Sequence, residues 1–296
     1  MEKYEMYTNT NYESAVKTPV NRKPIMATNT LSLGIIGKGF VGGAVSNGFN
    51  TKTVEQYTVD PRFSDLSIED LVEANPEVTF ICLPTPTGID GSVDAELIRQ
   101  ALQKLEALRY EGIVVIKSTV SASVLETFIN TFTKLDVVYN PEFLTEANAN
   151  DDFINPPFQI FGGDWDTCTK VEQMYLKHST VKPVPTFKLH IKAASFLKYT
   201  INSWLATKVV FFNELRKLYD TYNMETSWEE FVGVLSHEPR VGPSHMNVPG
   251  PDGQFGFGGN CFPKDTKAFV EESRDSYMLR LLEQAIQIND SLRVDR

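Results

Sequence analysis

The sequence predicts an α/β protein in which a doubly wound parallel sheet is followed by an α-helical domain built on one long helix. Three observations lead to this fold class. Short apolar runs alternate with helix-like segments through the first part of the chain, a pattern typical of parallel strands joined by helices. A glycine-rich turn follows the first apolar run. After residue 190 the strand signals stop, and a single helical pattern covers residues 192–222.

The composition limits the classes of function. The 296 residues carry a formal net charge of -10, which argues against nonspecific nucleic-acid binding and against anionic membrane surfaces. The three cysteines, Cys82, Cys168 and Cys261, lie far apart and form neither a disulfide framework nor a zinc spacing. The histidines show no metal-ligand spacing either. We therefore expect a protein of the reducing cytoplasm with no metal site.

The chain divides into three expected parts. Residues 1–29 are rich in Asn, Thr, Lys and Tyr without periodicity, which predicts a flexible N-terminal extension. Residues 30–190 contain the strand signals, and residues 191–296 form the helical part. No apolar run is long enough to cross a membrane, and the N-terminus lacks the apolar core of a signal peptide.

The glycine-rich turn predicts a dinucleotide site. The apolar run 31–36 is followed by Gly37, Gly39 and Gly42, and a helix is expected over 41–49. Gly37 permits the tight turn, Gly39 lets the backbone approach a pyrophosphate, and Gly42 lets the helix pack closely on the strand. This pattern is the fingerprint of a Rossmann dinucleotide-binding domain. A glycine turn that binds no ligand is the alternative.

An acidic residue after the second predicted strand, 53–59, indicates the kind of cofactor. A carboxylate at the position of Asp60 accepts hydrogen bonds from a ribose 2′-hydroxyl and repels a 2′-phosphate, which favours NAD over NADP. Arg62 weakens this preference, because it brings a positive charge close by. The expected cofactor is NAD.

The remaining strand signals place polar motifs at one edge of the sheet. Four more strands are predicted at 77–83, 112–117, 135–139 and 158–161, with helices at 94–108 and 123–132. The polar motifs 84–87, 118–119 and 140–146 each follow one of these strands. Because the carboxyl ends of parallel strands share one edge, we expect these motifs to surround a ligand.

The long helix, 192–222, carries two polar residues beside its apolar stripe. Lys198 and Asn202 lie one turn apart at the edge of that stripe. A lysine there is either partly desolvated and in need of a partner, or extended so that its ammonium group reaches solvent. Helical geometry does not decide between the two. The stripe is longer than one small domain covers, which predicts a homodimer formed through this helix.

The loop 256–261 ends in a cysteine whose surroundings suggest covalent chemistry. Its three glycines allow the backbone to approach a ligand closely. Pro263 suits a first helical turn, which places Cys261 at or just before a helix N-terminus. We expect the helix dipole and Lys264 to lower the pKa of the thiol, with Asp265 on the same helix face. A buried structural cysteine is the alternative.

Taken together, these motifs resemble those of the UDP-glucose/GDP-mannose dehydrogenase family from about Leu31 to Leu292. The matching motifs, in order, are Gly37–Gly42, Leu83–Thr87, Lys117–Val120, Asn140–Leu144, Lys198 to Glu214, and Gly258–Asp265. The resemblance implies a Rossmann domain that binds NAD and a helical central domain that carries the catalytic cysteine loop. It further implies oxidation of the C6 primary alcohol of a nucleotide sugar, UDP-glucose foremost, to a carboxylate with two NAD per turnover.

The resemblance also implies roles for individual residues. Cys261 would be the nucleophile and would pass through a thiohemiacetal and a thioester. The other residues expected in catalysis are Lys198 and Asn202 at the oxyanion, Asp265 and Thr119 at a water, and Glu142 in thioester hydrolysis. Those expected at NAD are Gly37, Gly39, Phe40, Val41, Gly42, Asp60, Pro84, Thr85, Thr119, Glu146 and Lys264. Those expected at the nucleotide sugar are Phe143, Leu144, Glu146, Lys198, Asn202, Arg240, Phe255 and Gly258.

The chain departs from the family pattern at several positions and in length. Ser121, Ala147, Asn260 and the segment 156–158 replace residues that family members usually carry. Family members continue past the last helix into a second Rossmann-like domain that completes the nucleotide-sugar site. The resemblance therefore implies that this chain lacks that domain, or that a second chain supplies it.

Two other functions fit parts of the sequence. A β-hydroxyacid dehydrogenase also has a Rossmann domain followed by a long helix with Lys and Asn, but that function leaves Cys261 unexplained. A non-catalytic protein that binds NAD or a nucleotide sugar is the other, and the length of the chain is its main support.

Overall fold

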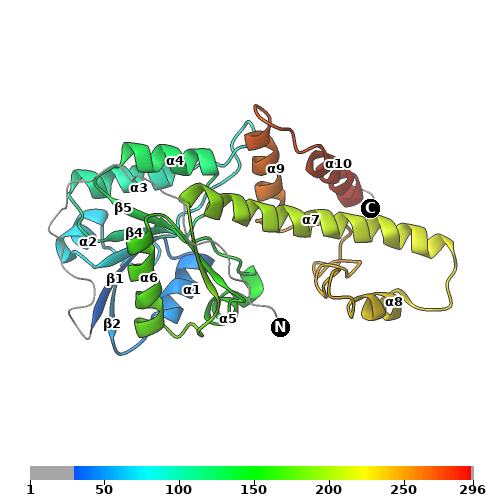
Figure 1. Ribbon diagram of the computed structural model, residues 1–296, viewed down its shortest axis with the longest axis horizontal. Helices are drawn as coiled ribbons and strands as arrows, with labels where there is room; N and C mark the ends of the chain where they lie inside the picture. The colour runs from blue at the N-terminus through cyan, green and yellow to red at the C-terminus, as the bar shows by residue number, and fades with distance from the viewer. Residues whose placement is uncertain (1–29, 295–296) are drawn as a thin grey trace, which may run out of the picture.

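One seven-stranded sheet forms the centre of the first part of the chain (Figure 1). The computed structural model describes residues 30–294, so the predicted extension 1–29 lies outside the described residues. The strands are β1 (Leu31–Ile36), β2 (Val54–Val59), β3 (Val78–Ile81), β4 (Ile113–Ile116), β5 (Asp136–Tyr139), β6 (Gln159–Gly162) and β7 (Thr186–Leu189). The sequence predicts the first six but not β7, because Pro183 and Pro185 interrupt the pattern just before it.

The strand order is β2-β1-β3-β4-β5-β6-β7, which places β2 and β3 on opposite sides of β1. The winding of the chain therefore reverses beside β1, and in such sheets ligands bind at that point, beyond the carboxyl ends of the strands. Strands β1 to β5 are parallel, as predicted. Strand β6 instead meets β5 in an antiparallel pair, Tyr139 with Gly162, and pairs with β7 in parallel. The sheet is thus mostly parallel.

Helices cover both faces of this sheet (Figure 1). One face is covered by α2 (Ile68–Ala74), α3 (Glu96–Ala107) and α4 (Ala122–Thr131). The other is covered by α1 (Phe40–Gly48), α5 (Ala149–Ile154), which follows the short 3-10 helix η1 (Glu146–Asn148), and α6 (Trp165–His178). Each face has its own hydrophobic core, because a parallel sheet buries apolar residues on both sides. This arrangement confirms the predicted doubly wound α/β fold.

The second part of the chain is built on α7 (Ile191–Thr221), which extends away from the sheet (Figure 1). Helices α9 (Phe262–Ser273) and α10 (Arg280–Val294) pack against α7 and against each other. Helix α8 (Trp228–Leu235) packs near the far end of α7 and begins with a reciprocal capping pair, Ser227 and Glu230. One long helix therefore organises this part, as predicted.

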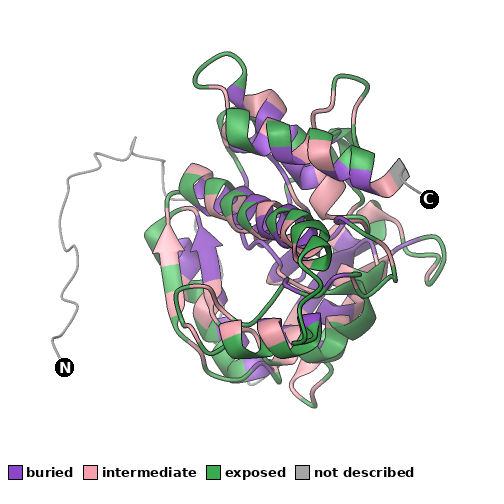
Figure 2. Cartoon of the chain, turned by 90° about the vertical axis from the view of Figure 1, so that its right-hand side faces the viewer, coloured by how far each residue is buried: buried purple, intermediate pink, exposed green. Residues whose placement is uncertain are grey.

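The surface of α7 has an exposed apolar side. Buried and exposed residues alternate around the helices of this part (Figure 2). Trp204, Phe211 and Leu218 are 60%, 60% and 54% exposed although they are apolar. They lie seven residues apart, about two helical turns, so they line one side of the helix.

Two kinds of feature are absent from residues 30–294. None of the helices in this range is both long enough and apolar enough to cross a membrane. Over the same range, no group of three or more His, Cys, Asp or Glu residues could hold a metal ion.

Candidate active site

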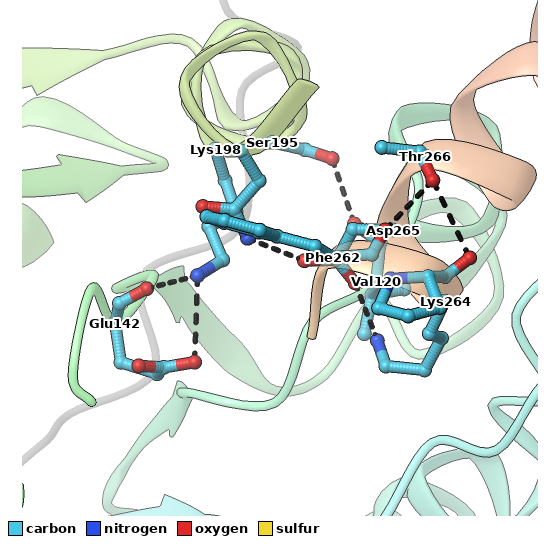
Figure 3. Close-up of polar contacts among 10 residues, drawn as sticks. Val120, Glu142, Ser195, Lys198, Phe262, Lys264, Asp265 and Thr266 are labelled. Atoms are coloured by element: carbon cyan, nitrogen blue, oxygen red, sulfur yellow. Dashed lines mark hydrogen bonds and ion pairs between the residues drawn. The ribbon is translucent and has the colours of Figure 1, made fainter. Parts of the chain in front are cut away.

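A buried ion pair links α7 to the loop after β5. Lys198 and Glu142 are only 2% and 6% exposed. The Lys198 Nζ lies 3.4 Å from the Glu142 Oε1 and also donates to the backbone oxygen of Glu142 (Figure 3). The other carboxylate oxygen, Oε2, accepts from the backbone N–H of Leu144 at 2.6 Å. Of the two alternatives for Lys198, the structure shows the desolvated lysine with a partner.

Lys198 keeps its charge despite its burial. Burial lowers the pKa of the ammonium group, but the carboxylates of Glu142 and Asp265 outweigh that effect and hold the pKa above its ordinary value. The Nζ also lies 4.9 Å from the centre of the Phe143 ring, in a cation–π contact. A fixed cation inside the site is suited to stabilise negative charge that develops during a reaction.

A second buried carboxylate joins α7 to α9. Asp265 is 0% exposed, and one of its oxygens accepts from the Asn202 Nδ2 at 2.6 Å. The other oxygen accepts from the Lys264 Nζ, also at 2.6 Å (Figure 3). Asn202 lies one turn after Lys198, so the two side chains leave α7 on the same side. The structure thus brings Lys198, Asn202, Glu142 and Asp265 together, as the sequence predicts.

Cys261 lies directly before the first turn of α9, also as predicted. It is half-buried and unpaired, and the charges of Glu142, Lys198, Asp265 and Lys264 all act on it. The predicted lowering of the thiol pKa is wrong. Burial raises this pKa most, Glu142 raises it further, and the two lysines compensate only in part. The group is therefore a protonated thiol at neutral pH.

The glycine turn lies where the winding of the sheet reverses. Gly37 has a φ of 88°, a left-handed conformation that favours glycine. A side chain at Gly37 would collide with the backbone of Cys82, and one at Gly42 would collide with the backbone of Gly37. A side chain at Gly39 would meet nothing within 4 Å. The backbone at Gly39 is therefore open to a pyrophosphate in front of the N-terminus of α1.

Asp60 follows β2 and is 5% exposed. Its Oδ2 accepts from the backbone N–H of Lys38 at 2.7 Å, and both of its oxygens accept from Arg62. The hydrogen bond from the Arg62 side chain is the main reason why the pKa of Asp60 falls to about 2. An ionised carboxylate beside the glycine turn fits a ribose hydroxyl of NAD.

The other predicted residues lie outside the buried cluster of Lys198, Asn202, Glu142 and Asp265. Thr119, partly buried, follows β4, and Glu146 accepts from the Asn260 Nδ2 at 3.0 Å across the exposed edge. Phe255 is exposed, and Arg240 is 89% exposed and pairs with Glu238, so the structure does not bring Arg240 into the buried cluster. The predicted residues at the ends of β1 and β3 are Phe40, Val41, Pro84 and Thr85.

Two contacts near the site involve residues without a predicted role. The Lys117 Nζ donates to the Asn140 Oδ1 at 2.9 Å, which joins the ends of β4 and β5. The Ser195 Oγ donates to the backbone oxygen of Val120 at 2.7 Å (Figure 3). Ser195 lies three residues before Lys198 on the same helix face. This spacing in the sequence could have identified Ser195 as a neighbour of the site.

The fold and the open glycine turn define the class of protein: an NAD-binding Rossmann protein with a helical domain attached. Two family models match the chain and together cover more than half of it. The NAD binding domain of the UDP-glucose/GDP-mannose dehydrogenase family matches residues 63–179, and the central domain of that family matches residues 192–291. The chain belongs to the UDP-glucose/GDP-mannose dehydrogenase family.

Individual relatives agree with this family. A UDP-glucose 6-dehydrogenase of Haloferax volcanii is 29% identical over 256 residues, which are 80% of this chain and 57% of that protein. A UDP-glucose dehydrogenase structure from Pyrobaculum islandicum has a TM-score of 0.76 at 24% identity and covers 90% of this chain and 69% of its own. A 3-hydroxyisobutyrate dehydrogenase of Mycobacterium tuberculosis has a TM-score of 0.69 at 16% identity, with 90% and 94% covered. These structures show a shared fold. The chain spans about half the length of the curated relatives it matches.

Proposed function

We propose that the chain catalyses the NAD-dependent oxidation of the C6 primary alcohol of a nucleotide sugar, UDP-glucose, to the carboxylate. The observation that carries this proposal is the buried cluster of Lys198, Glu142, Asn202 and Asp265, with Cys261 at the start of the helix that carries Asp265. The family and the relatives named as UDP-glucose 6-dehydrogenases support it. Bound NAD would accept one proton together with two electrons, that is a hydride, from the substrate carbon in each of two oxidations.

Cys261 would act on the aldehyde that the first oxidation leaves. Its sulfur forms a bond to the aldehyde carbon, the thiol proton is lost, and the aldehyde oxygen gains a proton to give a thiohemiacetal. The second oxidation removes the hydrogen on that carbon and the hydroxyl proton, which gives a thioester. Water then attacks the thioester carbon, the carbon–sulfur bond breaks, and the carboxylate and the thiol are released.

The side chains around the thiol suit these steps. The Lys198 ammonium and the Asn202 amide are donors for the oxyanion of the adduct. Asp265 and Thr119 would position a water for proton transfer, and Glu142 would assist thioester hydrolysis. Because the thiol is protonated at rest, a neighbouring base has to accept its proton as the sulfur attacks. Glu142 and Asp265 are the carboxylates that act on the thiol.

The cofactor and the substrate would meet at the edge of the sheet. We assign residues 30–190 to the NAD-binding domain and residues 191–296 to the helical domain that carries the cysteine. The pyrophosphate would contact Gly37, Gly39 and Gly42, and the ribose would contact Asp60. The other proposed NAD contacts are Phe40, Val41, Pro84, Thr85, Thr119, Glu146 and Lys264. The proposed sugar contacts are Phe143, Leu144, Glu146, Lys198, Asn202, Arg240, Phe255 and Gly258.

A direct test counts the NADH formed per sugar. Purified protein is mixed with NAD and with UDP-glucose, GDP-mannose or UDP-N-acetylmannosamine, and the absorbance of NADH is followed. We expect two NADH per molecule of UDP-glucose consumed. One NADH per substrate would instead indicate a two-electron dehydrogenase. No NADH with any sugar, while NAD still binds in calorimetry, would rule out activity of this chain alone. Activity that returns on adding a second polypeptide would then identify a partner-dependent enzyme.

The exposed side of α7 supports a homodimer. Trp204, Phe211 and Leu218 are exposed apolar residues on one side of the helix, and pairing with a second copy would remove them from water. We expect the wild-type protein to sediment as a dimer and the variant Trp204→Asp with Phe211→Asp to sediment as a monomer. Trp165→Asp is the matched control, since Trp165 is similarly exposed but lies on α6. A wild-type monomer at micromolar concentration would contradict the proposal.

A further inference from the structure

Helix α10 holds the loop that leads to the catalytic cysteine. The Arg293 side chain donates from Nη1 to the Asp252 Oδ2 at 2.7 Å and to the Gln254 Oε1 at 2.8 Å. It also donates from Nη2 to the backbone oxygen of Gly256 at 3.2 Å and from Nε to that of Phe257 at 3.1 Å. One guanidinium group thus contacts four residues of a six-residue segment, and its planar fork fixes their relative positions.

A second side chain of α10 contacts the same segment. Asn289, one turn before Arg293 and only 4% exposed, accepts the backbone N–H of Phe257 on its Oδ1 at 2.6 Å. From the opposite side, the Asn213 Oδ1 on α7 accepts the backbone N–H of Gly256 at 2.8 Å. The loop is therefore held between α7 and α10, and its backbone groups are satisfied by side chains of these two helices.

The glycines of this loop have two different roles. A side chain at Gly256 would collide with Asn289, and one at Gly258 would collide with Arg293. The absence of side chains at these two glycines leaves room for the Asn289 and Arg293 side chains of α10 beside the loop. A side chain at Gly259, which has a φ of 73°, would meet nothing within 4 Å. The open side of the loop, where a ligand can approach the backbone, therefore lies at Gly259.

The held segment is close to the reacting group along the chain. Phe257 is 5% exposed and packs in the hydrophobic core between α7 and α10. Its ring also meets that of Phe262, the first residue of α9, at a centroid distance of 6.2 Å. Cys261 lies between Phe257 and Phe262 in the sequence, so the contact between these two rings ties the held segment to the start of α9, where the thiol lies.

We propose that Arg293 and Asn289 are positioning residues for the active site: from α10 they fix the segment 252–258 and, through it, the place of the Cys261 thiol. The catalytic role of the thiol in this inference rests on the proposed function, whereas the contacts that hold the loop do not. Neither residue touches the reacting atoms. Each acts through the loop backbone.

The test replaces Arg293 and follows the loop without relying on turnover. In Arg293→Met, we expect hydrogen–deuterium exchange in the segment 252–258 to become about tenfold faster, because four hydrogen bonds to the loop are lost. Alkylation of Cys261 by iodoacetamide should become several times faster at pH 8, because a more exposed thiol ionises more easily. With UDP-glucose, the KM should rise about tenfold, while the Kd for NAD stays unchanged.

Two further variants make the test specific. Arg280→Met is the matched control, since it is the same substitution on the same helix at an exposed position whose side chain makes no contact with the loop. Arg293→Lys keeps the charge but not the planar fork, and we expect it to restore the exchange rate only in part. All variants are first compared with the wild type by circular dichroism and thermal unfolding.

The outcomes separate this inference from the proposed function. Equal exchange and alkylation rates in Arg293→Met and Arg280→Met would overturn the positioning role, whatever the activity. Faster exchange and alkylation in Arg293→Met support it, even if the wild type makes no NADH with any nucleotide sugar. That second result would remove the proposed function and leave the placement of the cysteine by α10 intact. Faster exchange with an unchanged alkylation rate would show that the loop does not position the thiol, and would also overturn the inference.

Discussion

Replacing Cys261 with serine is expected to abolish formation of the carboxylate. A serine hydroxyl is a far weaker nucleophile than a thiol, so the covalent adduct does not form, and kcat should fall on the order of 10³-fold or more. The measurement is NADH release with UDP-glucose, together with product analysis for the uronate. Cys168→Ala is the control, because Cys168 is 0% exposed in the core beside the sheet and should keep full turnover.

Alkylation at different pH values tests the state of the Cys261 thiol in the wild type. Because burial and Glu142 raise the pKa of Cys261, alkylation should be slow at neutral pH and should accelerate as the pH rises above 9. Glu142→Gln removes one of the three causes that raise this pKa, the others being burial and Asp265, so its alkylation curve should move to lower pH. A wild-type curve already at its plateau at pH 7 would contradict the raised pKa, and a fully active Cys261→Ser variant would exclude the covalent route.

Replacing Lys198 with methionine should cost both activity and stability. The substitution leaves the Glu142 carboxylate buried without its cation, which costs about 3–5 kcal/mol of unfolding free energy for a buried pair. It also removes the donor proposed for the oxyanion, so kcat should fall about 10²–10³-fold. Equilibrium unfolding in urea and steady-state kinetics measure the two effects separately.

Two variants serve as controls for Lys198. Lys192→Met is the same substitution on the same helix, at an ion pair with Glu126 in which both side chains are more than one-third exposed. It should change stability by about 1 kcal/mol or less. The double variant Lys198→Met with Glu142→Gln should regain most of the lost stability but none of the activity. Equal free energies of unfolding for Lys198→Met and Lys192→Met would contradict the predicted cost of breaking the buried ion pair.

The stability that Lys198 contributes has a defined dependence on pH. Its pKa in the folded state lies above the ordinary value, so the contribution is fully present below that ordinary value. It is lost only as the pH rises through the folded-state pKa, well into the alkaline range. The pair therefore stabilises the protein across the neutral range in which we propose that it works.

The fold was largely accessible to reasoning from the sequence, because its signals are local. Alternating apolar runs and helical patterns predict six of the seven strands and α7 to within about two residues. Strand β7 was not predicted, because two prolines just before it and a lysine within it interrupt the apolar pattern of a short edge strand. Its partner, β6, is also distant in the sequence. The antiparallel pairing of β5 and β6 was not predicted either, because strand direction depends on the connection between the strands and not on their composition.

The site could be predicted where helical spacing or a nearby proline carries the signal. Lys198 and Asn202 share a face of α7, and Cys261 precedes Pro263, so their positions follow from local rules. The pKa of the thiol does not, because it depends on burial and on Glu142, which lies far away in the sequence. The contacts of Arg293 with the loop could not be predicted from hydrophobic periodicity either, because they join segments about 40 residues apart.

The protonated state of Cys261 has a consequence for how the protein withstands oxidising conditions. Peroxide attacks the thiolate, and a cysteine that rests as a thiol is a poor target for conversion to sulfenic acid. Cys82 and Cys168 are buried, and burial raises the pKa of each to about 12, so neither offers a thiolate in its place. In the proposed mechanism the Cys261 thiolate forms only during turnover, when bound substrate covers the sulfur, so peroxide would meet the thiol form of this residue at rest.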